Sequence, residues 1–206
     1  MGKIGLLGGT FDPIHNAHLF MGQLCADALG LDKVIFVPSG IAPHKDAVTT
    51  NPEIRYEMVK LAIAENPLFC VSDYETNKKT PSYSVETVEY FKSLYPDDEI
   101  IFILGEDSLD YVDKWYDAQK LLKLCSFAVV ARGGFESNIE AKIRYLKDNF
   151  SATIYNITSP ELDISSRFVR SIISKGKSAK YLVPDVVLDY IKEQGMYNDA
   201  NQCNEF

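Results

Sequence analysis

Short apolar runs alternate along this chain with longer segments of helical period, and this alternation constrains the fold more than any other feature. The apolar runs predict strands at Lys3–Leu7, Lys33–Val37, Leu68–Ser72, Glu99–Leu104, Phe127–Ala131 and Thr153–Asn156. The periodic segments predict helices at Ala17–Leu29, Ile54–Glu65, Val85–Leu94, Ile139–Lys147 and Pro184–Gln194. Strands that alternate with helices in this way indicate an α/β fold with a mainly parallel sheet flanked by helices.

A single domain accounts for the whole pattern. The 206 residues, 46% of them hydrophobic, are enough for one compact unit with a sizeable core. The sequence has no internal repeat, low-complexity tract or linker-like change of composition. We therefore expect one Rossmann-like, doubly wound domain over residues 1–198 and a frayed polar tail over residues 199–206. Ligands of such folds bind where strands end and helices begin.

The composition narrows the classes of partner. A formal net charge of -8 argues against a broad attraction to nucleic acid or to an anionic membrane, so an anionic ligand must be held locally. Cys25, Cys70, Cys125 and Cys203 are too far apart for a C-x-x-C motif, and three of them lie in apolar runs, so we expect buried thiols in a reducing compartment. The N-terminus does not resemble a signal peptide, and no apolar stretch reaches the roughly 18 residues that span a bilayer. The expected location is cytoplasmic.

The first candidate site is the stretch "LLGGTFDPIHNAH", which leaves the first predicted strand and enters a helix. Gly8 and Gly9 let backbone N–H groups approach a ligand closely, and a helix N-terminus favours an anion. His15 and His18 are three residues apart, so they project from the same side of the first turn and can donate hydrogen bonds to phosphate oxygens. Taken alone, the stretch is also typical of a glycine-rich strand exit with structural histidines.

Two other functions of this stretch are disfavoured. It lacks the G-x-G-x-x-G pattern of dinucleotide-binding folds, and no acidic residue ends the second strand at Val37, which argues against a dehydrogenase. A zinc site made with His44 is disfavoured because no carboxylate or cysteine lies at ligand spacing.

The second candidate site is "DISSRFVRSIISKGK", residues 163–177. Ser165 or Ser166 is a suitable N-cap for a helix that begins at Arg167. The period places Phe168, Val169, Ile172 and Ile173 toward the core, and it leaves Arg167, Arg170, Ser171 and Ser174 on the other face. By itself this is a capped surface helix with solvated arginines. Together with the first site, it suggests a polyphosphate held from two sides.

A third candidate is the loop "SGIAPHKD" after the second predicted strand, where Lys45 follows a stiffening proline. Charged loop residues are usually solvated. Here Lys45 would also lie at the edge where the strands end, within reach of the same ligand.

Together these residues resemble the nucleotidyltransferases of the H-x-G-H superfamily, and in particular the bacterial nicotinate mononucleotide adenylyltransferases. The similar stretches cover nearly the whole chain and follow in the family's order: "KIGLLGGTFDPIHNAH", "VPSGIAPHKD", "PSYSVETV", "ILGEDSLDYVDKWY", "VVARGGF", "ISSRFVR" and "YLVPDVVLDYIKEQGMY". Two residues depart from the family's pattern. Ala17 stands where H-x-G-H has glycine, and Arg167 stands where I-S-S-T-x-x-R has threonine.

The resemblance implies an enzyme of NAD biosynthesis that transfers the adenylyl group of ATP to nicotinate mononucleotide, by direct in-line attack and without a covalent intermediate. It implies Mg²⁺ that enters with ATP and no metal ligands from protein side chains. The catalytic residues implied are His15, His18, Lys45 and Arg170. The ATP-binding residues implied are Gly8, Gly9, Thr10, Phe11, Gly105, Asp107, Arg132, Ser165 and Ser166.

The resemblance also places the pyridine substrate. Trp115 and Tyr116 would stack on the ring, and backbone N–H groups around Tyr83 and Ser84, at a helix start, would bind its carboxylate. Such a helix start prefers a carboxylate to an uncharged amide, which would select nicotinate over nicotinamide. From its position alone, Trp115 is as readily a core anchor.

Several alternatives stay open. The phosphopantetheine, flavin mononucleotide and glycerol-phosphate nucleotidyltransferases share the first motif, whereas "PSYS" and "KWY" favour a pyridine substrate. Class I aminoacyl-tRNA synthetases have a similar histidine signature, but this chain is too short to add a tRNA-binding domain. A regulatory module that binds nucleotide without turnover is the alternative from a different class. The sequence leaves open whether the protein is a homo-oligomer.

Overall fold

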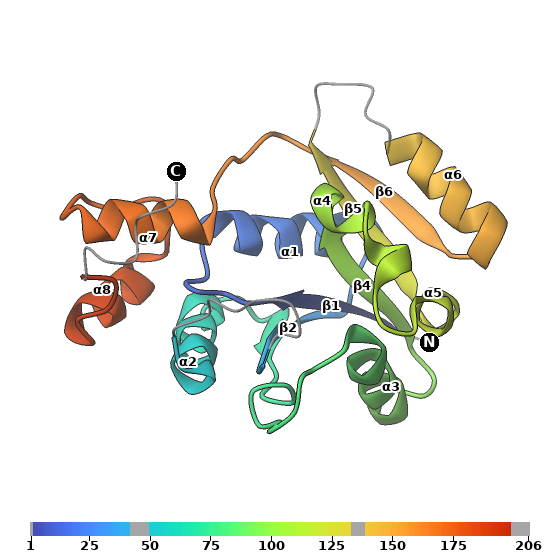
Figure 1. The fold of residues 1–206 in the computed structure, drawn as a ribbon, viewed down its shortest axis with the longest axis horizontal. Coiled ribbons are helices and arrows are strands. Elements are labelled where there is room, and N and C mark those ends of the chain that lie inside the picture. The colour runs from blue at the N-terminus through green and yellow to red at the C-terminus, as the bar shows by residue number, and fades with distance from the viewer. Residues whose placement is uncertain (1, 42–49, 133–138, 199–206) are drawn as a thin grey trace.

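The computed structural model describes residues 2–41, 50–132 and 139–198, and in them strands alternate with helices (Figure 1). The strands are β1 (Lys3–Gly9), β2 (Lys33–Pro38), β3 (Phe69–Val71), β4 (Glu99–Gly105), β5 (Ser126–Arg132) and β6 (Ile154–Ser159). The helices are α1 (Asn16–Leu29), α2 (Pro52–Ile63), α3 (Ser84–Leu94), α4 (Glu106–Leu109), the 3₁₀ helix η1 (Val112–Lys114), α5 (Ala118–Leu124), α6 (Ile139–Phe150), α7 (Ser166–Ser174) and α8 (Asp185–Glu193).

The strands of the described chain form one parallel sheet in the order β3-β2-β1-β4-β5-β6. In this sheet β1 lies between β2 and β4, with Leu7 opposite Phe36 on one side and Ile103 on the other. The chain therefore leaves β1 toward one edge of the sheet and later returns to build the other edge. The loops after β1 and β4 diverge at this switch point, which is where open α/β sheets bind ligands. The predicted α/β class and its parallel sheet are confirmed.

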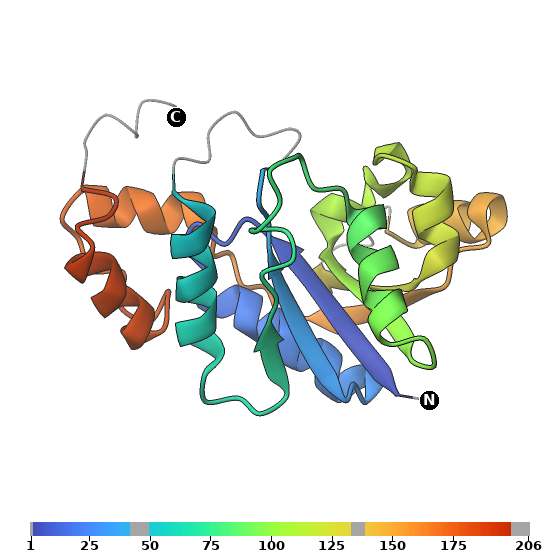
Figure 2. The same cartoon turned by 90° about the horizontal axis from the view of Figure 1, so that it is seen from below.

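Alternate residues of each strand face two separate cores, as expected for a sheet covered on both sides. Ile4 and Leu6 of β1 pack into a core shared with α3, α5 and α6, whereas Leu7 packs into a second core with α1 and α2. In Figure 2, α1 and α2 accordingly lie on one side of β1 and β2, and α3 lies on the other.

Helices α7 and α8 lie together at the end of the molecule away from α6 (Figure 1). They share a small core of Val169, Ala179, Val183 and Leu188, all nearly inaccessible to solvent. Val187 and Ile191 of α8 also pack into the second sheet core, so the two helices are part of the same packed structure as the sheet. This packing holds the start of α7 beside the start of α1.

Two expectations about burial need correction. Phe168 is 49% exposed, although the helical period places it toward the core, and Ser171 is buried in its place. Cys25 and Cys125 are buried as expected, but Cys70 on the edge strand β3 is exposed. Cys203 and the tail 199–206 lie outside the described residues. In the part of the chain that is described, no helix has the length and apolar character needed to span a membrane.

Candidate active site

In the loop between β1 and α1, the ring of Phe11 packs closely against the backbone of Gly9. A Cβ atom at this position would lie 2.8 Å from the ring of Phe11. Phe11 itself adopts a left-handed backbone conformation (φ 51°), which is uncommon for a bulky residue, and its ring is fully buried. The burial of this ring therefore supports a strained loop conformation directly after the strand.

His15 and His18 lie together at the start of α1, as the sequence predicts. Their rings stack with centroids 3.6 Å apart, and the ring of His18 contacts that of Phe11 edge-on at 4.9 Å. The backbone N–H of His15, which is the N-cap residue, donates to Nδ1 of His18 at 3.3 Å. Because Nδ1 of His18 accepts this hydrogen bond, the ring carries its proton on Nε2, the atom that can act as a donor.

His15 is buried, and this burial lowers the pKa of its imidazole from 6.5 to about 4. The ring is therefore neutral near pH 7. Its Nδ1 atom is inaccessible to solvent and makes no full hydrogen bond among the described residues, but the backbone N–H of His18 faces the His15 side chain in a reciprocal capping arrangement.

The loop is fixed from α7 and from the C-terminal side of α8. Arg170 of α7 donates from Nη1 to the carbonyl of Asp12 at 2.6 Å, and Ser166 donates from its hydroxyl to the carbonyl of Pro13 at 2.9 Å. Tyr197 donates from its hydroxyl to the carboxylate of Asp12 at 2.6 Å. Asp12 is buried, and the hydroxyl of Tyr197 supplies its carboxylate with a hydrogen bond. The first two predicted sites therefore meet through direct hydrogen bonds.

The start of α7 has the predicted cap. Ser165 is the N-cap, and its hydroxyl accepts a hydrogen bond from the backbone N–H of Phe168 at 3.2 Å. The hydroxyls of Ser165 and Ser166 are thus both used within the protein. Arg167, which departs from the family's pattern, is exposed in the first turn of the helix.

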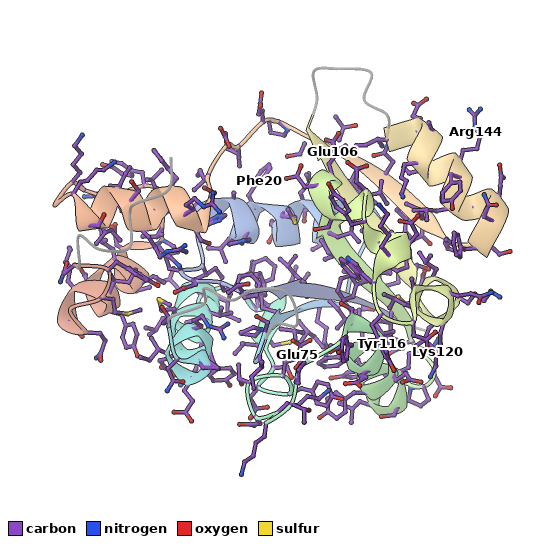
Figure 3. All side chains as sticks on the ribbon, viewed as in Figure 1. Phe20, Glu75, Glu106, Tyr116, Lys120 and Arg144 are labelled. Atoms are coloured by element: carbon purple, nitrogen blue, oxygen red, sulfur yellow. The ribbon has the colours of Figure 1, made fainter. Side chains whose placement is uncertain are left out.

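Gly105 ends β4 and is the N-cap of α4, and Asp107 lies exposed in the first turn of that helix. Figure 3 shows Glu106, the first residue of α4. Arg132 ends β5, opposite Ser159 of β6. Gly105 and the glycines Gly8 and Gly9 therefore lie at the carboxyl ends of neighbouring strands.

Three of the predicted pyridine-binding residues come together at the start of α3. Tyr83 is the N-cap of α3, Ser84 is its first residue, and the ring of Tyr116 lies 4.3 Å from that of Tyr83. Tyr116 is 60% exposed and lies beside α3 in Figure 3. Trp115 is half-buried and packs edge-on against Phe102 of the core at 6.0 Å, so it has a structural role whether or not it also stacks on a ligand.

Some predictions fall outside what the structure describes. His44 and Lys45 lie within residues 42–49, and of Arg132 only the backbone is described. Within residues 2–41, 50–132 and 139–198, no three or more His, Cys, Asp or Glu side chains are grouped closely enough to hold a metal ion.

The sequence analysis missed several buried or partly buried polar residues near the ends of β1 and β2 and before α3. The missed residues are Asp12, Ser39, Arg55, Ser82 and Tyr197. The hydroxyls of Ser39 and Ser82 have no hydrogen-bond partner among the described residues, and Arg55 is completely buried. The only sequence signal for Arg55 was a charged residue on the otherwise apolar face of a predicted helix.

The arrangement can hold an extended anion. Imidazole groups lie at the start of α1, backbone N–H groups lie at the start of α7, and Arg170 of α7 reaches the loop that precedes α1. Helix N-termini and arginine donors together favour a polyphosphate over a monoanion.

Comparison with protein families gives an independent finding. Residues 6–172 match the model of the cytidylyltransferase-like family. A protein of Caldicellulosiruptor saccharolyticus named as a probable nicotinate-nucleotide adenylyltransferase is 41% identical over 197 residues, which cover 96% of this chain and 100% of that protein. A protein of Geotalea daltonii with the same name is 40% identical over 96% of this chain and 99% of its own length.

Solved structures support the fold. A Plasmodium falciparum nicotinic acid mononucleotide adenylyltransferase complexed with NaAD superposes with a TM-score of 0.79 at 22% identity, covering 96% of this chain and 98% of that one. The same parasite protein complexed with APC gives a TM-score of 0.76 with the same coverage.

Proposed function

Because the chain belongs to the family of nicotinate-nucleotide adenylyltransferases, enzymes that make deamido-NAD from nicotinate mononucleotide and ATP, we propose how its residues carry out this transfer. A phosphate oxygen of nicotinate mononucleotide attacks the α-phosphorus of ATP. The bond from that phosphorus to the bridging oxygen of the β-phosphate breaks, and pyrophosphate leaves. The nucleophile is already an anion, so the reaction needs neither a covalent intermediate nor a strong base.

The protein's task is then positioning and charge stabilisation. Two polyanions must be held in line, and negative charge grows on the departing pyrophosphate. Holding the reactants in this geometry can supply on the order of 7–11 kcal/mol of the barrier. The loop after β1, which is braced by Phe11 and Asp12, is rigid enough to provide such a platform.

The observation that carries this proposal is the stacked pair of histidines at the start of α1. His18 has Nδ1 occupied by a backbone donor, so its Nε2–H is directed to the α-phosphate. His15, neutral because burial holds its pKa at about 4, acts as a hydrogen-bonding group rather than as a cation.

Arg170 and the start of α7 bind the leaving phosphates in this proposal. One nitrogen of Arg170 is anchored on the Asp12 carbonyl, and its other N–H groups supply further donors at a fixed place. Because the hydroxyls of Ser165 and Ser166 are engaged within the protein, α7 acts through its backbone N–H groups and through Arg167. Lys45 supplies a further cation.

Mg²⁺ that accompanies ATP would be held by phosphate oxygens of the nucleotide, and it would supply charge neutralisation on the departing pyrophosphate. Gly8, Gly9, Thr10, Gly105, Asp107 and Arg132 border the ATP, and the start of α3 binds the pyridine carboxylate. Tyr116 and Trp115 close that pocket with aromatic surface.

The test is His18→Ala, assayed by pyrophosphate release with MgATP and nicotinate mononucleotide. Loss of one positioned donor to a developing charge typically costs on the order of a hundredfold in kcat, and the KM for ATP should change much less. The control is Gln23→Ala, which should retain kcat. Gln23 lies further along the same helix, and its side chain makes hydrogen bonds with Asp27 and Asn66. Near-normal kcat in His18→Ala would remove His18 from the mechanism.

A further inference from the structure

Arg55, in the first turns of α2, is 0% exposed, which is rare for an arginine. Neither a charged side chain nor its hydrogen-bonding groups can be buried cheaply without partners. The contacts that compensate for this burial therefore indicate what the residue does.

The guanidinium of Arg55 joins three separate segments of backbone. Nη1 donates to the carbonyl of Thr10 at 2.6 Å, Nη2 to that of Gly40 at 3.2 Å, and Nε to that of Thr50 at 3.2 Å. Thr10 lies in the loop after β1, Gly40 follows β2, and Thr50 precedes α2. Because a guanidinium is planar and its donors are fixed in direction, these contacts set the three carbonyls relative to one another.

The charge of Arg55 is also balanced at this place. The groups that act on it electrostatically are Asp12, Glu75 and Tyr197. Burial lowers the pKa of Arg55, and the carboxylates of Asp12 and Glu75 raise it, so the guanidinium stays protonated throughout the working range of an enzyme. Any replacement that removes the positive charge would leave Asp12 less well compensated.

The carbonyl of Thr10 is close to the proposed chemistry. The peptide that begins at Thr10 continues into Phe11, whose left-handed backbone and buried ring place it edge-on against His18. By holding the Thr10 carbonyl, Arg55 therefore also fixes the backbone of Phe11, the residue whose ring packs against His18. The second acceptor is equally constrained, because a Cβ atom at Gly40 would overlap the backbone carbonyl of Glu75.

We propose that Arg55 is a positioning residue for adenylyl transfer, which holds the loop after β1 in register with the segment that follows β2 without touching either substrate. This inference rests on the proposed role of that loop in binding ATP. The competing explanation is that Arg55 only balances buried charge and stabilises the fold.

Arg55→Lys separates these two roles. It keeps the positive charge, but its donors sit on a single nitrogen and cannot reproduce the fork that reaches three carbonyls. Val59→Ala, one turn along the same helix at another completely buried position, is the matched control for loss of stability. Arg144→Lys controls for the exchange itself, because Arg144 is exposed and points away from α6 in Figure 3.

Kinetics are measured per folded molecule, well below each variant's thermal transition. For Arg55→Lys we expect kcat to fall about tenfold to a hundredfold and the KM for ATP to rise several-fold, because small misplacements of a catalytic group have effects of this size. Val59→Ala should melt at a lower temperature with unchanged kcat and KM. Kinetics of Arg55→Lys equal to those of Val59→Ala would overturn the proposal.

Gly40→Ala is a second arm that decides the matter even where Arg55→Lys does not fold. It displaces an acceptor of Arg55 while leaving the arginine and its charge in place, and we expect the same loss of kcat with a rise in the KM for ATP. Unchanged kinetics in Gly40→Ala would also overturn the proposal. Wild-type protein in the same assay distinguishes failure of the proposed function from failure of the proposed role of Arg55. If the wild type releases no pyrophosphate, the proposed function is contradicted. If the wild type is active and the variants have unaltered kinetics, only the role of Arg55 is contradicted.

Discussion

At the scale of single residues, the central feature is a histidine that is kept neutral by burial. An imidazolium beside ATP would add attraction in the ground state as well as in the transition state. A neutral, positioned donor instead acts where charge develops. The packing of His15 against His18 thus links the energetics of folding to the proposed chemistry.

This burial predicts a pH dependence of stability. The pKa of His15 is about 4 in the folded protein and 6.5 in the unfolded chain, so between these pH values only the unfolded state binds the proton. The contribution of the neutral ring is complete above pH 6.5 and is lost as the pH falls toward 4. The expected loss is about 1.4 kcal/mol per pH unit in that window.

The measurement is the free energy of unfolding in urea from pH 7 to pH 4.5, for wild type and for His15→Asn, which has no titrating group at this position. Taking the difference between the two cancels the carboxylates, including Glu75, whose pKa is raised by burial. The free energy of unfolding of the wild type minus that of His15→Asn should fall steadily as the pH falls. Parallel profiles would show that His15 is not held neutral.

At the scale of elements, the site is the meeting of helix starts at the ends of strands. Most of these elements follow from sequence period, because β1, β2 and β4 are continuous apolar runs and α1 and α8 are amphipathic with recognisable ends. The start of α7 was predictable from Ser165, whose hydroxyl can cap a helix whatever the rest of the fold does.

Other parts were not predictable, for physical reasons. Helices α4, α5 and η1 are short, and their position depends on packing between β4 and β5 rather than on a periodic pattern. The burial of Ser171 in place of Phe168 depends on how α7 meets α8. Arg55 and Tyr197 reach the loop after β1 from positions 45 and 185 residues away in the sequence, which no local pattern encodes.

Trp115 tests the assignment of the pyridine pocket. Trp115→Ala should raise the KM for nicotinate mononucleotide about tenfold through loss of aromatic stacking, with little change in the KM for ATP. Tyr111→Ala is the control, because Tyr111 is exposed and lies just before η1. A variant that only melts at a lower temperature, with both KM values intact, would restrict Trp115 to its contact with Phe102.

Arg167 tests the start of α7. Its exposed guanidinium can reach a phosphate only when ATP is bound, so Arg167→Thr should raise the KM for ATP several-fold and leave the melting temperature within a few degrees of wild type. Lys177→Ala, which removes an exposed cation just beyond the other end of α7, should leave this KM unchanged. An unaltered KM in Arg167→Thr would mean that α7 binds phosphate through its backbone alone.

At the scale of the whole molecule, widely separated parts of the chain converge on the loop after β1. Arg170 of α7 and Tyr197 beyond α8 bind Asp12, while Arg55 of α2 binds Thr10. The small core of α7 and α8 is thereby connected to the sheet at the switch point between β1 and β4. These contacts connect both sides of the proposed phosphate site.

The central claim is that this unit transfers an adenylyl group to nicotinate mononucleotide. The most direct measurement is pyrophosphate release from MgATP with nicotinate mononucleotide, nicotinamide mononucleotide or phosphopantetheine, with the nucleotide product identified by mass spectrometry. We expect deamido-NAD and pyrophosphate in equal amounts with the first substrate, a much lower kcat/KM with the second, and no reaction with the third. ATP binding without pyrophosphate release, or a preference for phosphopantetheine, would contradict the claim.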